Sequence, residues 1–264
     1  MHTISAKTVT LASGLSVDFA ETGDPGGIPV VFVHGYVESW RYFELVLEHL
    51  PPALHGYALT LRGHGGADGP GGYAPGDFAA DVLGFLDAVG LERAAIVGAS
   101  SGGLVAQLVA SSQPHRVSAL VLLSAPVALA DKPGVIARWE EIAKLEDPVD
   151  PAFVEEFVLA TSPASVPDEL VRVLVGESQK IPARVWKETL RGLIDADLPV
   201  ALERITAPTL LIWGDQDAFV AGDQAILLRD IPDARQVVYE GCGHGPHLAE
   251  PERVVRDLVH FLAG

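Results

Sequence analysis

VGASSGG, residues 97–103, is the stretch of this 264-residue chain that decides its fold. It follows the apolar run Ala94–Val97 and precedes Leu104–Ser112, whose apolar residues have helical spacing. Glycines stand two residues on either side of Ser100, in the pattern G-x-S-x-G, which places a serine on a sharp turn between a strand and a helix. Glycine tolerates such a turn because it has no Cβ atom, and the serine side chain then projects into a cleft. A turn that binds a phosphate through its backbone amides is the alternative.

Short apolar or β-branched runs recur on both sides of this stretch. Such runs, separated by longer amphipathic stretches, predict strands that are buried on both faces of a parallel sheet. They are Val30–Val33, Tyr57–Leu61, Ala94–Val97, Ala119–Leu123, Thr209–Trp213 and Gln236–Tyr239. The segments around Val9 and Val17 predict an antiparallel hairpin at the edge of the same sheet.

Helical spacing of apolar residues occurs between several of these runs. The stretches concerned are Asp77–Val89, Leu104–Ser112 and Pro251–Leu262. Alternating strands and helices predict an α/β fold with a mostly parallel, doubly wound sheet. Because a single hydrophobic core can grow to about 250–300 residues, we expect one large domain with an insertion.

Residues 127–199, called the insert below, break this alternation. They contain no strong strand pattern and four successive helical stretches, Gly134–Leu145, Pro151–Leu159, Pro167–Lys180 and Ala183–Leu193. An insertion between two strands of an open α/β sheet lies above the carboxyl ends of the strands, where ligands bind in such folds. We therefore expect residues 1–126 and 200–264 to form the core and the insert to form a helical cap over it.

Two downstream segments carry the side chains that would activate a serine. A serine hydroxyl is a weak nucleophile until a base, oriented by an acid, removes its proton. Asp215 and Asp217 follow the apolar run that ends at Trp213, and His244 lies between glycines after the last apolar run. Singly, an Asp after a strand is usually a turn former and a loop His an ordinary surface residue. Since they occur in the order Ser, Asp, His, each after its own strand, we predict that they act together.

The segment His34-Gly35-Tyr36 follows the first strong strand. Acyl transfer requires two backbone N–H donors for the negatively charged oxygen, one after the nucleophile and one from this loop. We expect these donors to be the N–H groups of Ser101 and Tyr36. His34 itself is expected to brace the loop through hydrogen bonds.

These motifs resemble the α/β-hydrolase superfamily, in particular its small esterase- and lactonase-like members with a helical cap. The resemblance covers nearly the whole chain and implies the α/β-hydrolase fold. Its motifs are HG at 34–35, LRGHG at 61–65, the turn at Ser100, WGDQD at 213–217 and GH at 243–244. In the family's pattern the acid is the third residue after the glycine that ends the strand, which implies Asp217 rather than Asp215. The base follows the glycine directly, which implies His244 rather than His247.

Some branches of the superfamily do not fit. Haloalkane dehalogenases and epoxide hydrolases carry an Asp where this chain has Ser100. Some lactonases take their acid from the strand before the cap, but residues 123–126, LSAP, contain no carboxylate. Thr60 stands where many relatives have an Asp, and Ala99 and Ser101 replace a commoner His and Met. The turn around the serine therefore does not define a subfamily.

Composition excludes several other classes of protein. The chain has 18 Lys and Arg against 35 Asp and Glu, a net charge of −17, which should repel nucleic acids and anionic membranes. An apolar content of 48% is too high for a disordered protein. Cys242 is the single cysteine, so no intrachain disulfide can form, and the N-terminus has no secretory pattern. We expect a cytoplasmic protein.

No cofactor and no metal are expected. His244 and His247 have the H-x-x-H spacing of a metal pair, but Pro246 lies between them and no convincing third ligand is present. Four aromatic residues of the insert are candidates for lining a substrate pocket, although aromatic residues on helices more often pack a cap against the sheet. They are Trp139, Phe153, Phe157 and Trp186.

The sequence thus predicts a serine hydrolase that cleaves a small-molecule carboxylic ester or lactone through an acyl-enzyme at Ser100. Alternatives on the same fold are carbon–carbon bond hydrolysis, perhydrolase or cofactor-free haloperoxidase activity, and a ligand receptor without turnover. The cap has no obvious cationic cluster, which argues against a diacid diketone substrate. Neither the substrate nor the oligomeric state follows from the sequence.

Overall fold

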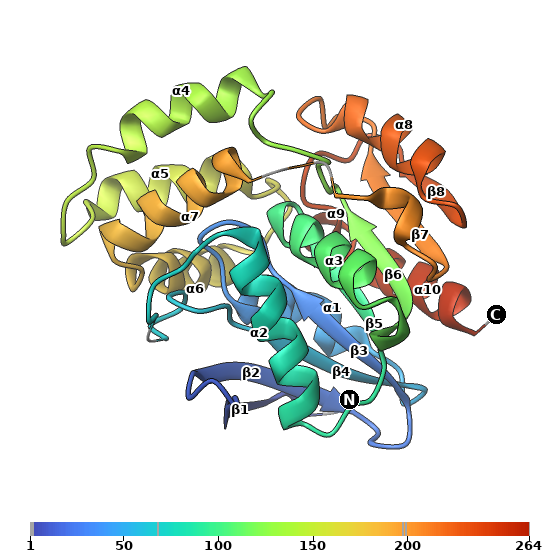
Figure 1. The fold of residues 1–264 in the computed structure, drawn as a ribbon. Helices are drawn as coiled ribbons and strands as arrows, with labels where there is room; N and C mark the ends of the chain where they lie inside the picture. The colour runs from blue at the N-terminus through green and yellow to red at the C-terminus, as the bar shows by residue number, and fades with distance from the viewer. Residues whose placement is uncertain (1–2, 68, 197, 199, 264) are drawn as a thin grey trace.

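One eight-stranded sheet forms the centre of the computed structural model, which describes residues 3–67, 69–196, 198 and 200–263 (Figure 1). The strands are β1 (Ser5–Thr10), β2 (Ser16–Gly23), β3 (Ile28–Val33), β4 (Leu54–Leu59), β5 (Ala94–Ala99), β6 (Val117–Leu123), β7 (Thr209–Gly214) and β8 (Ala234–Tyr239). Their order in the sheet is β1-β2-β4-β3-β5-β6-β7-β8. The pairs from β4 to β8 are parallel, and the hairpin of β1 and β2 is antiparallel with Val9 opposite Val17. The predicted α/β sheet and its edge hairpin are confirmed.

Helices cover both faces of this sheet. Val30 and Phe32 of β3 belong to one hydrophobic cluster, and Val31 and Val33 belong to the other. The cluster with Val30 and Phe32 packs under η1 (Trp40–Phe43), α1 (Glu44–His49) and α10 (Pro251–Leu262). The cluster with Val31 and Val33 packs under α2 (Pro75–Ala88), α3 (Ser101–Ser112) and α8 (Ala221–Asp230) (Figure 1). Burial on both faces explains why the strands read as continuous apolar runs rather than as alternating patterns.

Strand β4 ends two residues before the predicted boundary at Leu61. The reason is local, because the Leu61 N–H donates a hydrogen bond to the His34 imidazole at 3.0 Å instead of to a neighbouring strand.

Several short helical elements were not predicted from the sequence. They are α1, α8, α9 (Pro246–Ala249) and the turns η2 (Pro114–Arg116) and η3 (Leu202–Arg204). No helix formed by the described residues is long and apolar enough to cross a membrane.

The insert forms four helices between β6 and β7. They are α4 (Pro133–Ile142), α5 (Pro151–Thr161), α6 (Asp168–Gln179) and α7 (Ala183–Asp195), each within three residues of a predicted stretch at both ends. Figure 1 shows them gathered at the end of the sheet where β6 finishes. Their buried side chains, such as Val154 and Trp186, join the cluster that packs under α2 and α3. The division into core and cap stays a prediction, and its boundary at residue 199 lies outside the described residues.

Candidate active site

Ser100 occupies the sharp turn between β5 and α3. Its backbone has φ 49° and ψ −125°, a conformation that is strained for any residue with a side chain. A Cβ atom at Gly98 would lie 2.5 Å from the carbonyl oxygen of Gly102, and one at Gly102 would lie 2.3 Å from that of His34. Both positions therefore require glycine, as the sequence pattern predicts. The turn leaves the Ser100 side chain partly exposed at the edge of a pocket.

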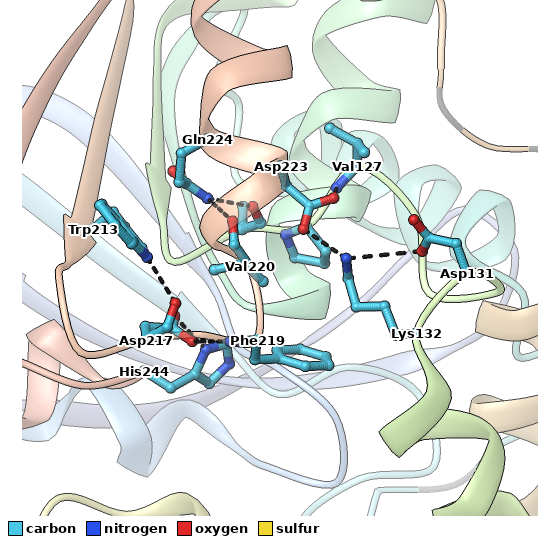
Figure 2. Close-up of polar contacts among 12 residues, drawn as sticks. Val127, Asp131, Lys132, Trp213, Asp217, Phe219, Val220, Asp223, Gln224 and His244 are labelled. Carbon is cyan, nitrogen blue, oxygen red and sulfur yellow. Dashed lines mark hydrogen bonds and ion pairs between the residues drawn. The ribbon is translucent and has the colours of Figure 1, made fainter.

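His244 connects Ser100 to Asp217. The Nε2 atom of His244 lies 2.8 Å from Ser100 Oγ, and Nδ1 lies 2.8 Å from Asp217 Oδ2. Because a carboxylate only accepts hydrogen bonds, Nδ1 carries the proton and Nε2 accepts the Ser100 hydroxyl. Asp217 is 3% exposed, and its other oxygen accepts the Phe219 N–H at 3.2 Å (Figure 2). Three residues from three different strand ends thus form one hydrogen-bonded chain.

Asp215 has a different environment from Asp217. Its Oδ1 atom accepts the backbone N–H of Gly241 at 2.7 Å and the side-chain amide of Gln216 at 3.0 Å. These contacts join the turn after β7 to the loop that carries His244. Asp215 therefore shapes the turn, and the carboxylate that reaches His244 is that of Asp217.

The loop of residues 34–38 lies beside the serine turn. His34 is buried; its Nδ1–H donates to Gly35 O at 2.8 Å and its Nε2 accepts from Leu61 at 3.0 Å, so it braces the loop as expected. Burial holds the pKa of His34 well below its usual range, so the ring is uncharged. Tyr36 and Ser101 both line the pocket with Ser100. Among the residues that the structure describes, neither of their backbone N–H groups donates a hydrogen bond, which leaves both able to bind a ligand oxygen.

The insert holds the same loop from the other side. The Tyr36 hydroxyl donates to the carbonyl oxygen of Trp186 on α7 at 2.7 Å. The Ser178 hydroxyl, on α6, donates to Val37 O at 2.9 Å. Val37 has φ 54°, which is rare for a β-branched residue. The conformation of this loop consequently depends on contacts with two helices of the insert.

A pocket of about 720 Å³ opens in front of Ser100 and His244. Its size lies within the usual range for small-molecule sites, roughly 300–1,000 Å³. The insert, the loop after β8 and the residue Phe219 contribute most of the wall. The larger apolar side chains that line it are Leu129, Val135, Phe157, Leu190, Leu193, Phe219 and Leu248.

Of the four aromatic residues proposed for the pocket, the structure places only Phe157 on its wall. Trp186 is fully buried and packs edge to face against Tyr36 and Phe157, with ring centroids 5.8 and 5.2 Å apart. Phe153 also packs against Trp186, with ring centroids 5.8 Å apart, and Trp139 is half-buried on α4. These three residues pack the insert together, and the expectation that they line the pocket is corrected accordingly.

Glu38, Arg138, Phe219 and His247 also line the pocket, and none of them was predicted from the sequence as a pocket residue. Phe219 stands two residues after Asp217, and His247 stands three residues after His244. Their closeness in sequence to the proposed triad could have indicated that they line the pocket. Burial lowers the pKa of His247 to about 3, and its uncharged ring packs on Phe43. Among the described residues, no three His, Cys, Asp or Glu side chains are grouped as metal ligands.

A buried ion pair fixes the start of the insert to the core. Asp223, on α8, is 3% exposed; its two oxygens accept from Lys132 Nζ at 2.6 Å and from the Val127 N–H at 3.0 Å (Figure 2). The neighbouring Gln224 amide donates to Ala125 O at 3.0 Å. Helix α8 follows directly after the Asp217 loop, so these bonds link that loop to the insert.

Comparisons with known proteins agree with this fold. Residues 30–257 match the model of the alpha/beta hydrolase family. The chain is 26% identical to Epoxide hydrolase 4 of Mus musculus over 81% of this chain and 66% of that protein. It is 27% identical to a pimeloyl-(acyl-carrier protein) methyl ester esterase of Yersinia pseudotuberculosis over 89% of this chain and 93% of that one. The crystal structure of esterase RhEst1 from Rhodococcus sp. ECU1013 superposes with a TM-score of 0.83 at 27% identity, over 98% of this chain and 99% of that one. The resemblance noted in the sequence is confirmed: this chain belongs to the alpha/beta hydrolase family.

Proposed function

We propose that the protein is a serine hydrolase that cleaves a carboxylic ester or lactone through a covalent acyl-enzyme. The observation that carries the proposal is the hydrogen-bonded chain from Ser100 through His244 to Asp217 at the edge of an apolar pocket. The similar esterases from Yersinia and Rhodococcus support the same chemistry.

In the acylation half-reaction, the Ser100 oxygen attacks the ester carbonyl carbon while His244 Nε2 takes the hydroxyl proton. The buried Asp217 carboxylate accepts the Nδ1–H, keeps the imidazole in the tautomer that can act as a base, and stabilises its protonated form. The carbonyl oxygen becomes negative and accepts hydrogen bonds from the N–H groups of Tyr36 and Ser101. His244 then gives the proton to the leaving alkoxide, and the alcohol departs.

Water completes the reaction by the same steps. His244 takes a proton from a water molecule, the resulting hydroxide attacks the acyl carbon, and the two N–H donors again hold the negative oxygen. Collapse of this intermediate breaks the bond to Ser100 Oγ, which recovers its proton from His244. The products are a carboxylic acid and the free enzyme. In a lactone the acyl group and the alcohol belong to the same ring, so hydrolysis yields a single hydroxy acid.

The pocket supports a mainly apolar substrate of moderate size. Its wall is formed chiefly by aliphatic and aromatic side chains, and the acidic and basic side chains among the described lining residues are Glu38 and Arg138. Arg138 is already paired with Glu141 on the same helix at 2.6 Å. We further propose that the insert serves as the cap of this site, because Val135, Phe157 and Leu190 on its helices contribute to the pocket wall.

The proposal is tested by replacing the nucleophile. Ser100→Ala should lower kcat on activated esters by about 10⁶-fold, since removal of a triad serine eliminates the covalent route. Thermal stability should change little, because His244 is the hydrogen-bond partner of the hydroxyl among the described residues. Diisopropyl fluorophosphate should add one diisopropylphosphoryl group to the wild type, with loss of fluoride, and none to the variant. Intact mass and a panel of p-nitrophenyl esters and lactones measure both effects.

Ser112→Ala is the matched control, because Ser112 is an exposed serine at the far end of α3. It should retain wild-type rates and labelling. If Ser100→Ala kept wild-type turnover, Ser100 would not be the nucleophile. Tight binding of esters by the wild type with no turnover on any ester or lactone would favour the ligand-receptor alternative instead.

A further inference from the structure

Glu38 places a carboxyl group at the wall of the pocket, two residues after the proposed oxyanion donor Tyr36. Its Oε2 atom accepts the backbone N–H of Gly35 at 2.7 Å. Burial raises the pKa of this carboxyl to about 8. Within the described residues, no lysine or arginine forms an ion pair with it. The catalytic steps described above do not use this group.

Gly35 needs external restraint because a residue without a Cβ atom has wide backbone freedom. The structure holds it at both ends, since its N–H donates to Glu38 and its carbonyl oxygen accepts from His34 Nδ1 at 2.8 Å. The Gly35 carbonyl and the Tyr36 N–H belong to one planar trans peptide and point in opposite directions. Fixing Gly35 therefore also fixes the direction in which the Tyr36 N–H points.

We propose that Glu38 is a positioning residue for the hydrolysis, which closes the 34–38 loop on Gly35 and thereby aims the Tyr36 N–H at the substrate oxyanion. The inference rests on the proposed function. The strained Val37, at φ 54°, lies between Tyr36 and Glu38, so the loop would relax if this hydrogen bond were lost.

The protonation state of Glu38 then affects the rate. A neutral carboxylic acid still accepts the Gly35 N–H through an oxygen lone pair, and it adds no charge to the pocket. An ionised carboxylate would oppose the negative charge that develops on the substrate oxygen nearby. The rate should accordingly be highest when Glu38 is protonated and should fall above pH 8, where it ionises.

Other charged groups around Glu38 do not cancel this effect. On η1, burial and the negative charge of Glu38 together raise the pKa of the Tyr42 phenol. Arg138 on α4 forms an exposed ion pair with Glu141, at 2.6 Å, and solvent screens its charge. His247 is uncharged above pH 4, because burial lowers its pKa to about 3, and His244 is the proposed base.

Two variants separate positioning from simple packing. Glu38→Gln keeps an oxygen acceptor for Gly35 but cannot ionise, so kcat at pH 7 should stay within about threefold of wild type. Its kcat/KM on p-nitrophenyl butyrate, corrected for spontaneous hydrolysis, should lack the decline that the wild type shows above pH 8. Glu38→Ala removes the acceptor and should lower kcat about 10- to 100-fold with little change in KM, less than the 10²–10³-fold cost of deleting an oxyanion donor.

Glu48→Gln is the control, because Glu48 is an exposed carboxyl on α1, and its pH profile should match that of wild type. Melting temperatures establish that each variant is folded. If Glu38→Gln kept the wild-type decline above pH 8, or if folded Glu38→Ala kept its kcat, the inference would be wrong while the proposed function stood. A wild type without ester or lactone turnover would overturn both together.

Discussion

At the scale of single residues, the two aspartates after β7 differ in what they touch. Asp217→Asn should lower kcat about 10³–10⁴-fold, because an amide facing Nδ1 favours the wrong His244 tautomer. Asp215→Asn keeps an oxygen for the Gly241 N–H and should cost less than about tenfold. Steady-state kinetics on one activated ester compare the two variants directly. The reverse order of effects would move the acid assignment to Asp215.

The proposed triad could be predicted from the sequence because its members follow strand ends. The carboxyl ends of parallel strands converge at one edge of a sheet, so Ser100 after β5, Asp217 after β7 and His244 after β8 meet there. Glu38 could not be found in this way. Its position in the five-residue loop 34–38 gives no pattern, and its proposed importance comes from burial and one hydrogen bond.

At the scale of elements, the sheet and the helices of the insert follow from the sequence, but the packing of the insert does not. Phe153 and Phe157 lie one turn apart on the same face of α5, yet only Phe157 reaches the pocket. Both rings pack edge to face against the buried Trp186, so the pocket wall is not decided by their spacing on α5. Such an arrangement depends on how four helices settle on the sheet, and no local spacing encodes it.

Phe157 and Trp186 should therefore respond differently to truncation. Phe157→Ala should reduce kcat/KM about tenfold or more for a bulky aromatic ester and little for an acetate, because it enlarges the pocket. Trp186→Ala should lower stability by about 3–5 kcal/mol, since it empties a fully buried site, and should reduce both activities together. For each variant, kcat/KM on the bulky aromatic ester and on the acetate is measured together with the melting temperature. Equal losses on both esters for Phe157→Ala would contradict a role in substrate selection.

The buried pair of Asp223 and Lys132 should anchor the insert to α8. Asp223→Asn leaves the Lys132 ammonium without its partner and should destabilise the protein by about 3 kcal/mol. A double-mutant cycle with Lys132→Met, followed by urea unfolding, isolates the coupling between the two side chains. The exposed pair Arg256 and Glu252 is the control and should contribute less than about 1 kcal/mol. Coupling no larger than in the control would mean that this ion pair does not anchor the insert.

At the scale of the whole molecule, stability should depend on pH through four buried groups. Burial depresses the pKa values of His34, His64 and His247, the last two to about 4 and about 3, and it raises that of Glu38 to about 8. Between pH 4.5 and 6.5 the unfolded chain binds up to three more protons at the histidines and one fewer at Glu38. Stability should therefore fall on acidification, by on the order of 1–3 kcal/mol per pH unit.

Near pH 7 and above, most protons have left the unfolded histidines and Glu38 makes the larger difference between the two states. Because the folded state binds the Glu38 proton more tightly, stability should decline again as the pH rises toward 8. Urea unfolding at half-unit pH steps should thus show a maximum near pH 6.5–7. Glu38→Gln should remove the decline on the alkaline side, and His247→Phe should make the acid side shallower. The exposed His260→Gln is the control and should leave the curve unchanged. A curve that stays flat between pH 4.5 and 6.5 would contradict the burial of these histidines as neutral rings.

Tyr36 connects the position of the insert with the proposed oxyanion donor. Its phenol donates to the Trp186 carbonyl of the insert, and its backbone N–H is a proposed oxyanion donor. If the insert swings outward to admit substrate or release product, the hydrogen bond from the phenol breaks, and the loop that aims the N–H loses one of its supports. With the insert open, the Tyr36 N–H is then less well aimed at the substrate oxygen. Turnover would therefore be favoured in the closed form, and water that enters during product release would meet a site without this support.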